Sequence, residues 1–232
     1  MESRPLRAGV RRLLEAARNE EWTLDRSLGD ERDEPALREL VARTVAARRS
    51  AADLLRTVRA GEVFDDCAPV EVTEVGTWAQ LHAAGHHALT GLLAELDEAD
   101  EDLLAAEPGI RRDHPQYVWR EVVNRSARGP LHGYAGWHLD KGRVIESIGV
   151  LSRWYEALRG ANLPTKALSD ASYDLACWLS RVGRLDDAMR YLPDAFSYND
   201  RAAVPVLKAW ARQDRDLAAL GDRADFQTLV GA

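Results

Sequence analysis

Apolar residues recur along this chain at the spacing of an α-helix, and this pattern constrains the fold more than any other feature. Between residues 35 and 60, one stripe contains Leu37, Leu40, Val41, Val45, Ala52, Leu55 and Val58. A period of three to four residues places such side chains on one face of a helix, where they can be buried together. Similar stripes precede and follow this segment. The sequence therefore predicts an all-α fold.

Only residues 62–76 have the composition of a β-strand. Valines at 63, 70, 72 and 75 roughly alternate with polar residues there. A strand needs a partner for its backbone hydrogen bonds, and no second segment of this kind exists in the chain. We therefore predict an extended crossover between helices and not a sheet.

Glycines, prolines and clusters of polar residues divide the helical pattern into segments. Helices are predicted over 4–20, 35–60, 78–96, 116–126 and 131–158, and shorter helix pairs over 169–192 and 201–230. Thr77 is a typical N-cap for the helix that begins at Trp78. The segment GANLPTK, at 160–166, reads as a linker.

The change in helix length at this linker suggests three parts. The first is an N-terminal helix and loop over 1–34, the second a bundle of long helices over 35–162, and the third a set of short helical hairpins over 163–232.

Charge and composition exclude several classes of partner. The formal net charge is −7, whereas proteins that bind nucleic acid usually carry a basic excess to neutralise phosphates. No apolar run approaches the roughly 18–20 residues of a membrane span. No secretory leader opens the sequence, and Cys67 and Cys177 lack the spacing of a disulfide framework. We expect a cytoplasmic location, with no nucleic-acid or membrane partner.

Three of the six histidines lie between residues 82 and 87. His82 and His86 are one helical turn apart, and His87 points away from them toward solvent. The stripe that contains His82 and His86 is otherwise apolar and is made of Trp78, Leu89, Leu93 and Leu96. Two imidazoles at this spacing can hold one divalent metal. The alternative is a pair of buried histidines held by hydrogen bonds in the core.

A second cluster, HGYAGWHLDKGR, covers residues 132–143. Tyr134 and His138 are one turn apart, on a face that also carries Leu131, Ala135, Gly142 and Ile145. This face is expected to point inward, where paired helices of a bundle build metal and ligand sites. Glycines at 133, 136 and 142 cost helix stability, about 1 kcal/mol each. They are useful if a neighbouring helix or a ligand approaches closely.

Together the two clusters resemble the DinB/YfiT-like family of four-helix bundles, including its ClbS/DfsB branch. The resemblance rests on GTWAQLHAAGHHALTGLL at 76–93 and YAGWH at 134–138, and it covers about residues 35–160. In this family a tryptophan opens the second helix and a histidine follows eight positions later, as Trp78 and His86 do. The last bundle helix of many members carries HxxxH, which matches Tyr134 and His138 here.

The resemblance implies a ligand set and a range of activities. Members with three histidines bind a divalent metal, often nickel or zinc, and the best-understood ones are thiol-dependent transferases or isomerases. Proteins of the ClbS branch protect their producers against reactive natural products and need not use a metal. Because Tyr134 replaces one histidine, one hypothesis is that His82, His86 and His138 hold Zn, Ni or Fe. The alternative is that His86, Tyr134 and His138 line an organic pocket.

The C-terminal segment has a resemblance of its own. The stretch YDLACWLSRVGRLDDAMRYL, at 173–192, looks like a tetratricopeptide helix pair, with small and apolar residues at the expected positions (Leu175, Ala176, Gly183, Leu185, Ala188 and Leu192). Solenoids need about three repeats to be stable alone. This segment is therefore expected to cap the bundle, and its concave face is a candidate site for a peptide or protein partner.

We therefore expect a small-molecule enzyme or sequestering protein, a hydrolase or transferase that acts on a reactive metabolite in self-resistance or detoxification. His86 is the candidate general base, Tyr134 the proton donor or orienting hydroxyl, and His138 the third catalytic residue. A bound metal would activate a water or a thiol. The alternative is a non-enzymatic helical interaction protein that uses the C-terminal segment, with a homodimer left open. A hollow, polar bundle core would distinguish the first function from the second.

Overall fold

The computed structural model describes residues 6–64, 76–107, 117–161, 163, 166–197 and 203–231. Within these ranges the regular structure is entirely helical and contains no strand, which confirms the predicted all-α class. Most of the crossover predicted at 62–76 lies outside the described residues, as do Cys67 and residues 162, 164 and 165 of the predicted linker at 160–166.

The chain divides into two compact units, Met1–Trp137 and His138–Ala232. The predicted boundaries after residues 34 and 162 do not coincide with this division. The N-terminal helix belongs to the first unit because it buries Val10, Leu13, Leu14 and Ala17 in the core of that unit. The predicted bundle is divided at residue 137, so its last segment belongs to the second unit.

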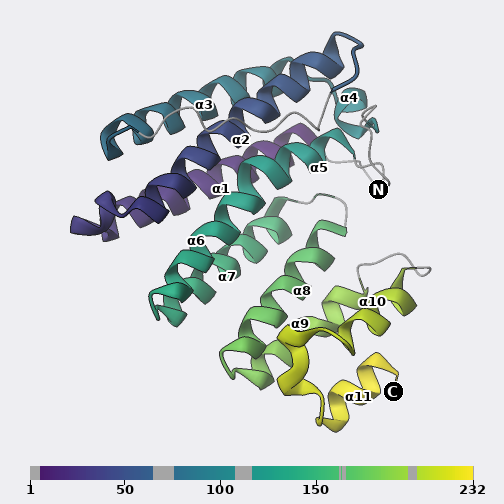
Figure 1. The fold of residues 1–232 in the computed structure, drawn as a ribbon. Helices are drawn as coiled ribbons and strands as arrows, with labels where there is room; N and C mark the ends of the chain where they lie inside the picture. The colour runs from purple at the N-terminus through teal and green to yellow at the C-terminus, as the bar shows by residue number, and fades with distance from the viewer. Residues whose placement is uncertain are drawn as a thin grey trace. The chain divides into compact units, whose positions relative to one another are not determined.

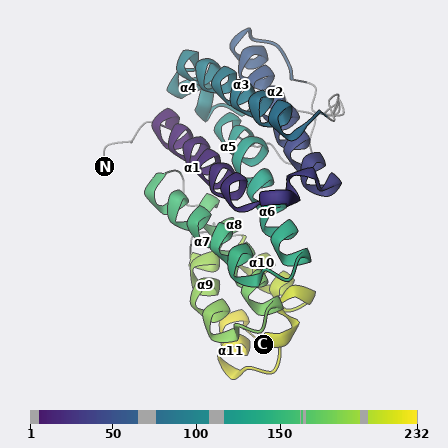
Figure 2. The ribbon, with the colours of Figure 1, turned by 90° about the vertical axis from the view of Figure 1, so that its left-hand side faces the viewer.

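The first unit is made of long helices and their short extensions. Its elements are α1 (Leu6–Ser27), the 3-10 helix η1 (Gly29–Asp33), α2 (Pro35–Arg59), α3 (Trp78–Glu98), α4 (Glu101–Ala105), α5 (Val118–Val123), the π-helix η2 (Asn124–Arg128) and α6 (Gly129–Asp140), whose last residues belong to the second unit. Helix α3 lies along α2, and α1 packs against α5 and η2 (Figures 1 and 2).

Local sequence signals explain where the two central helices begin and end. Pro35 occupies the first turn of α2, where its missing N–H removes no hydrogen bond. Gly61 follows α2 with φ +75°, a left-handed conformation that favours glycine. Thr77 accepts a hydrogen bond from the Gln80 backbone N–H, and the Gln80 side chain accepts one from Thr77, which completes a capping box. The predicted bounds of both helices are therefore nearly correct.

The long helix predicted over 131–158 is wrong, because the structure divides it into α6 and α7 (Val144–Ala161). The turn between them contains Gly142 with φ +71°. A helix cannot continue through a left-handed residue. Ile145, expected on the same inward face as Tyr134, is therefore 82% exposed.

One glycine of this region does permit a close approach between helices. A Cβ atom at Gly133 would lie 2.3 Å from Cδ1 of Leu40, so α2 packs over the bare backbone of α6 at this point. By contrast, a Cβ atom at Gly136 would meet nothing within 4 Å. Of these two glycines in α6, only Gly133 is explained by close packing against another helix.

We expect Gly136→Ala to raise the free energy of unfolding by about 1 kcal/mol, because alanine is the better helix former and finds open space. Gly142→Ala is expected to lower it by about 1–2 kcal/mol, because alanine is strained at φ +71°. Urea unfolding followed by circular dichroism measures both changes. If the two substitutions changed the free energy of unfolding by the same amount and in the same direction, the helix break at Gly142 would be contradicted.

The second unit is a set of shorter helices. Its elements are α7, α8 (Lys166–Arg181), α9 (Leu185–Ser197), α10 (Val204–Ala211), the 3-10 helix η3 (Arg215–Leu220) and α11 (Ala224–Val230). Helix α8 packs against α7, α9 and η3, while α10 contacts α9 and α11. The turn between α8 and α9 contains Gly183 with φ +77°, at the position where the sequence predicts the turn of a helix pair. Trp154 is buried in this unit, whereas Trp210 is exposed.

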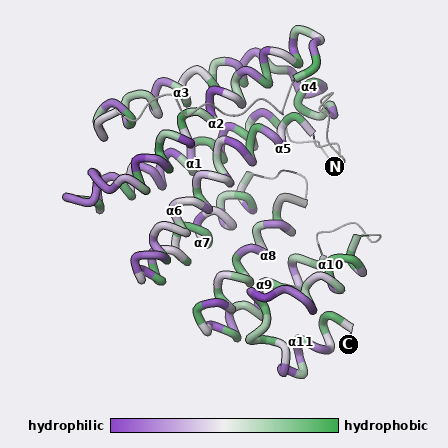
Figure 3. The backbone as a smooth tube through the Cα atoms, viewed as in Figure 1, coloured by the Kyte–Doolittle hydropathy of each residue, from purple (hydrophilic) through white to green (hydrophobic). Residues whose placement is uncertain are grey.

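The long helices α1, α2 and α3 each bury one face. Figure 3 shows hydrophilic and hydrophobic residues alternating along α1, α2 and α3, in agreement with the stripes of the sequence. Among the helices that the structure describes, none is both long enough and apolar enough to cross a membrane.

Candidate functional site

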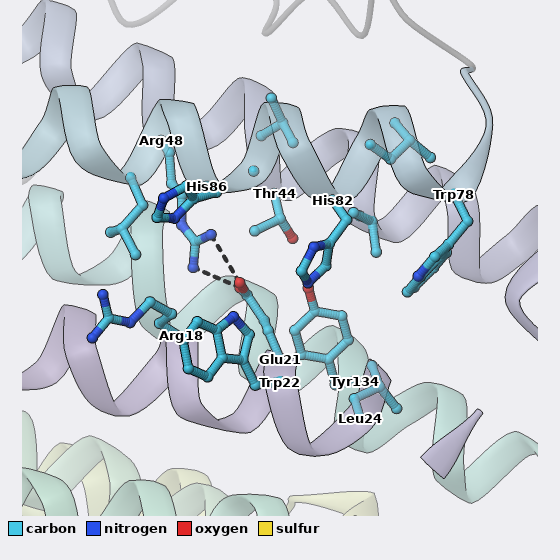
Figure 4. A pocket seen from close by; sticks show the side chains of 15 residues that line it. Arg18, Glu21, Trp22, Leu24, Thr44, Arg48, Trp78, His82, His86 and Tyr134 are labelled. Atoms are coloured by element: carbon cyan, nitrogen blue, oxygen red, sulfur yellow. Dashed lines mark hydrogen bonds and ion pairs between the residues drawn. The ribbon is translucent and has the colours of Figure 1, made fainter. Parts of the chain in front are cut away.

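A hollow lies between α1 and α3 in the first unit, with α2 and α6 behind it (Figure 4). Its inner part is a cavity of about 40 Å³. The polar and aromatic residues that line this cavity are Arg18, Glu21, Trp22, Thr44, Arg48, Trp78, His82, His86 and Tyr134. A volume of this size holds water or one small polar group of a ligand, and not a whole organic molecule.

The outer part of the hollow is an open cleft of about 490 Å³. It shares Trp22, Trp78, His82 and His86 with the inner cavity and adds Asp25 and Arg32. This volume lies within the range of small-molecule sites. Because the cleft and the cavity share these four residues, they adjoin each other, and together they are called the hollow.

The structure brings His82, His86 and Tyr134 together, as predicted, but corrects the register of α3. The buried residues of this helix are Leu81, Ala88, Leu89, Leu92 and Leu96. His82 is half-buried and His86 is exposed, so the two histidines lie at the edge of the buried face. They are therefore not core histidines. His87 is exposed, as expected.

The inner cavity contains an ion pair that sequence reasoning missed. Nη1 and Nη2 of Arg48 donate to the two carboxylate oxygens of Glu21 at 2.9 Å and 2.6 Å. The Arg48 side chain is 1% exposed and that of Glu21 is 17% exposed. The sequence does contain a signal for this ion pair, because Arg48 interrupts the apolar stripe of α2 between Val45 and Ala52. A charged residue at such a position needs a buried partner.

Tyr134 of α6 lines the same cavity as this ion pair. Burial, together with the negative charge of Glu21, raises the pKa of Tyr134 far above its ordinary value. The hydroxyl therefore stays protonated at neutral pH.

The two tryptophans of the cleft are held in different ways. The indole N–H of Trp78 donates to Oδ1 of Asp25 at 2.7 Å, and Nε of Arg32 lies 3.2 Å from the same oxygen. This chain of contacts ties the start of α3 to the end of α1. Trp22 is 44% exposed, and the guanidinium carbon of Arg18 lies 5.4 Å from its ring centroid. Both rings therefore offer apolar surface at the cleft.

The donor set does not fit the three-histidine metal centre implied by the resemblance. His138 is buried and lies one turn after Tyr134, but within the described residues it is not part of the lining of the hollow. His82 and His86 supply two imidazoles, and no third histidine, cysteine or carboxylate in the described ranges lies close enough to complete a group of three with them. No metal-dependent step is derived for this hollow.

Within the described residues, a group of three metal-ligand types occurs in the second unit instead. It consists of Cys177, Asp214 and Asp216, whose ligand atoms lie within 4.8 Å of one another. Asp214 already accepts from the Tyr173 hydroxyl at 2.9 Å and from the Asp216 backbone N–H at 2.9 Å, as the cap of η3. Burial, reinforced by Asp214, raises the pKa of Cys177. The thiol therefore stays protonated, which disfavours nucleophilic attack.

Buried tyrosines predict a loss of stability at alkaline pH. Burial raises the pKa of Tyr134, and burial with the hydrogen bond to Asp194 raises the pKa of Tyr155 to about 12. Tyrosines in the unfolded chain ionise near pH 10. Above that pH the folded state holds more protons, so stability falls as pH rises, by about 1.4 kcal/mol per pH unit for each such tyrosine.

The measurement is urea unfolding between pH 8 and pH 11.5. Above pH 10, the free energy of unfolding of Tyr134→Phe should fall less steeply with pH than that of wild type, by about 1.4 kcal/mol per pH unit. Tyr117→Phe changes an exposed position and should leave this pH dependence unchanged. Identical slopes for wild type and Tyr134→Phe would contradict the buried placement of this hydroxyl.

Comparison of the chain with protein-family models, curated proteins and solved structures finds no match.

Proposed function

We propose that the first unit binds a small organic molecule in the hollow between α1 and α3 and either sequesters it or transforms it by hydrolysis or group transfer. One observation carries this proposal: an open cleft of about 490 Å³ adjoins, at His82 and His86, a cavity that is lined by Glu21, Arg48 and Tyr134. A protein whose histidines were only structural would fill this space with apolar side chains.

The two histidines supply the chemistry of the proposal. Imidazole gains and loses protons near neutral pH. In a hydrolysis, His86 would accept the proton of a water molecule as the water oxygen attacks an electrophilic carbon of the ligand, and would then return that proton to the leaving group. The inner cavity is large enough for such a water. Arg48 would hold Glu21 in place through its two hydrogen bonds, and neither Arg48 nor Tyr134 would exchange protons.

The resemblance to DinB/YfiT-like bundles supports the same proposal. Trp78 and His86, which match the family spacing, both line the hollow. The ClbS branch acts against reactive natural products, so a reactive metabolite in self-resistance or detoxification is the proposed class of ligand. Metal dependence is not part of the proposal, because the three predicted histidines do not assemble at the hollow.

A second candidate function is binding of a peptide or protein by the second unit. Val206 and Trp210 are one turn apart on α10, and both are exposed. Large exposed apolar side chains on one helix face are typical of interaction surfaces. A photo-crosslinking amino acid at position 206, compared with one at exposed Arg190, tests this function in cells. Equal crosslinking at the two positions would count against it.

The experiment for the small-molecule function uses metabolite extracts. Purified wild-type protein is incubated with an extract, and mass spectrometry identifies compounds that are retained on the protein or consumed. We expect wild type to retain or consume at least one compound, and His86→Ala to lose most of this effect. Retention alone indicates sequestration, and consumption with a new product indicates catalysis.

His87→Ala is the matched control, because His87 is adjacent to His86 but is exposed and lies outside the hollow. It is expected to behave like wild type. If wild type neither retains nor consumes a compound, or if the two variants behave alike, the small-molecule function is wrong.

A further inference from the structure

The charges that line the hollow are not balanced. The inner cavity and the outer cleft contain two carboxylates, Glu21 and Asp25, and three guanidinium groups, those of Arg18, Arg32 and Arg48. Glu21 pairs with Arg48, and Asp25 pairs with Arg32 at 3.2 Å. Arg18 therefore has no carboxylate partner within the described residues. The hollow has a surplus positive charge in a chain whose net charge is −7.

The surroundings of Arg18 leave its charge available to a ligand. Its guanidinium carbon lies 5.4 Å from the Trp22 ring centroid, and its Nε is buried without a hydrogen-bond partner. Figure 4 shows Arg18, Trp22 and His86 at one end of the hollow. A guanidinium group donates two parallel hydrogen bonds to a carboxylate or phosphate, which makes an anion its natural partner.

The cleft also offers two aromatic surfaces. Trp22 is partly exposed, and the hydrogen bond to Asp25 fixes the orientation of Trp78 before any ligand arrives. Indole rings stack on flat aromatic groups with favourable energy beyond that of simple burial. A fixed ring binds at a lower entropic cost than a mobile one.

We propose that the ligand of this hollow is a planar aromatic anion. Its ring lies against Trp22 and Trp78 in the outer cleft, and its single carboxylate or phosphate group accepts hydrogen bonds from Arg18. This inference rests on the proposed small-molecule function and adds the chemical class of the ligand to it. Arg18 is assigned as the residue that selects an anion.

Isothermal titration calorimetry with three naphthalene probes tests the inference. The probes are 1-naphthoate, the neutral 1-naphthamide and the cationic 1-naphthylmethylammonium, which share one ring system and differ in charge. We expect 1-naphthoate to bind about tenfold more tightly than the other two, because a hydrogen bond to a charged group adds roughly that factor. Arg18→Gln should reduce naphthoate binding about tenfold and leave naphthamide binding within about twofold.

Arg12→Gln is the matched control, since it removes the same charge from an exposed position of the same helix. It should leave the binding of all three probes unchanged. The retained binding of naphthamide shows that the cleft of Arg18→Gln is intact. Trp22→Leu should weaken naphthoate and naphthamide equally.

Two outcomes overturn the inference and separate it from the proposed function. Naphthamide or the cation binding as tightly as naphthoate would reject an anionic ligand, while small-molecule binding itself would stand. If none of the probes binds at millimolar concentration, a planar aromatic anion is rejected, and the metabolite experiment decides separately whether the hollow has another ligand.

Discussion

Replacement of Arg48 by alanine is expected to lower the free energy of unfolding of the first unit by about 3–5 kcal/mol, the usual cost of removing one partner from a buried ion pair. The guanidinium group of Arg48 is almost completely buried and donates two hydrogen bonds to Glu21. Without it, the largely buried Glu21 carboxylate loses the two hydrogen bonds and the ion pair that Arg48 provides. Urea unfolding followed by tryptophan fluorescence measures the change.

Two further variants show whether this loss comes from the ion pair. Arg49→Ala removes an equivalent side chain from the next position of α2, which is exposed, and should change stability by less than about 0.5 kcal/mol. The double variant Glu21→Gln with Arg48→Met leaves no buried charge and is expected to recover more than half of the loss. A double variant as unstable as Arg48→Ala would show that packing and not charge dominates at this site.

The ion pair has a consequence for the function as well. A buried pair surrounded by apolar side chains is weak evidence for stability, because desolvation cancels much of the attraction. Here the pair borders a cavity that also contains Tyr134 and two histidines. Its position is therefore better explained by the requirements of a polar site than by those of the fold.

Much of the fold could be predicted because its signals are local. Pro35, Gly61 and Thr77 act through their own backbone conformation or through a hydrogen bond three residues away. The same kind of reasoning failed at Gly142. A glycine within a helical pattern is compatible with a helix and with a left-handed turn, and only packing decides between them.

The site was less predictable because its residues come from distant parts of the chain. Glu21 and Arg48 are 27 positions apart, and Trp78 and Asp25 are 53 apart. No periodicity relates such pairs. The histidines were found because both lie on one helix, whereas the charged residues opposite them required the packing of α1 against α3.

The register of α3 was the other point that periodicity left ambiguous. The sequence predicted Leu89, Leu93 and Leu96 on the buried face, whereas the structure buries Leu89, Leu92 and Leu96. The helical period of 3.6 residues allows both sets. They differ by a rotation of α3 about its axis of less than a quarter turn, which moves His82 and His86 by the same angle. That rotation decides whether the two imidazoles lie in the core or in the hollow.

Leu92→Ala is therefore expected to lower the free energy of unfolding by about 2–5 kcal/mol, since Leu92 is completely buried and its loss leaves a cavity. Leu93→Ala, one position further along the same helix, is half-buried and should cost about 1 kcal/mol. Urea unfolding of the pair tests the register without any knowledge of the ligand. Should Leu93→Ala prove the more damaging change, α3 would be rotated toward the sequence-based register. His82 and His86 would then be core residues, and the hollow would lose the groups on which its proposed chemistry depends.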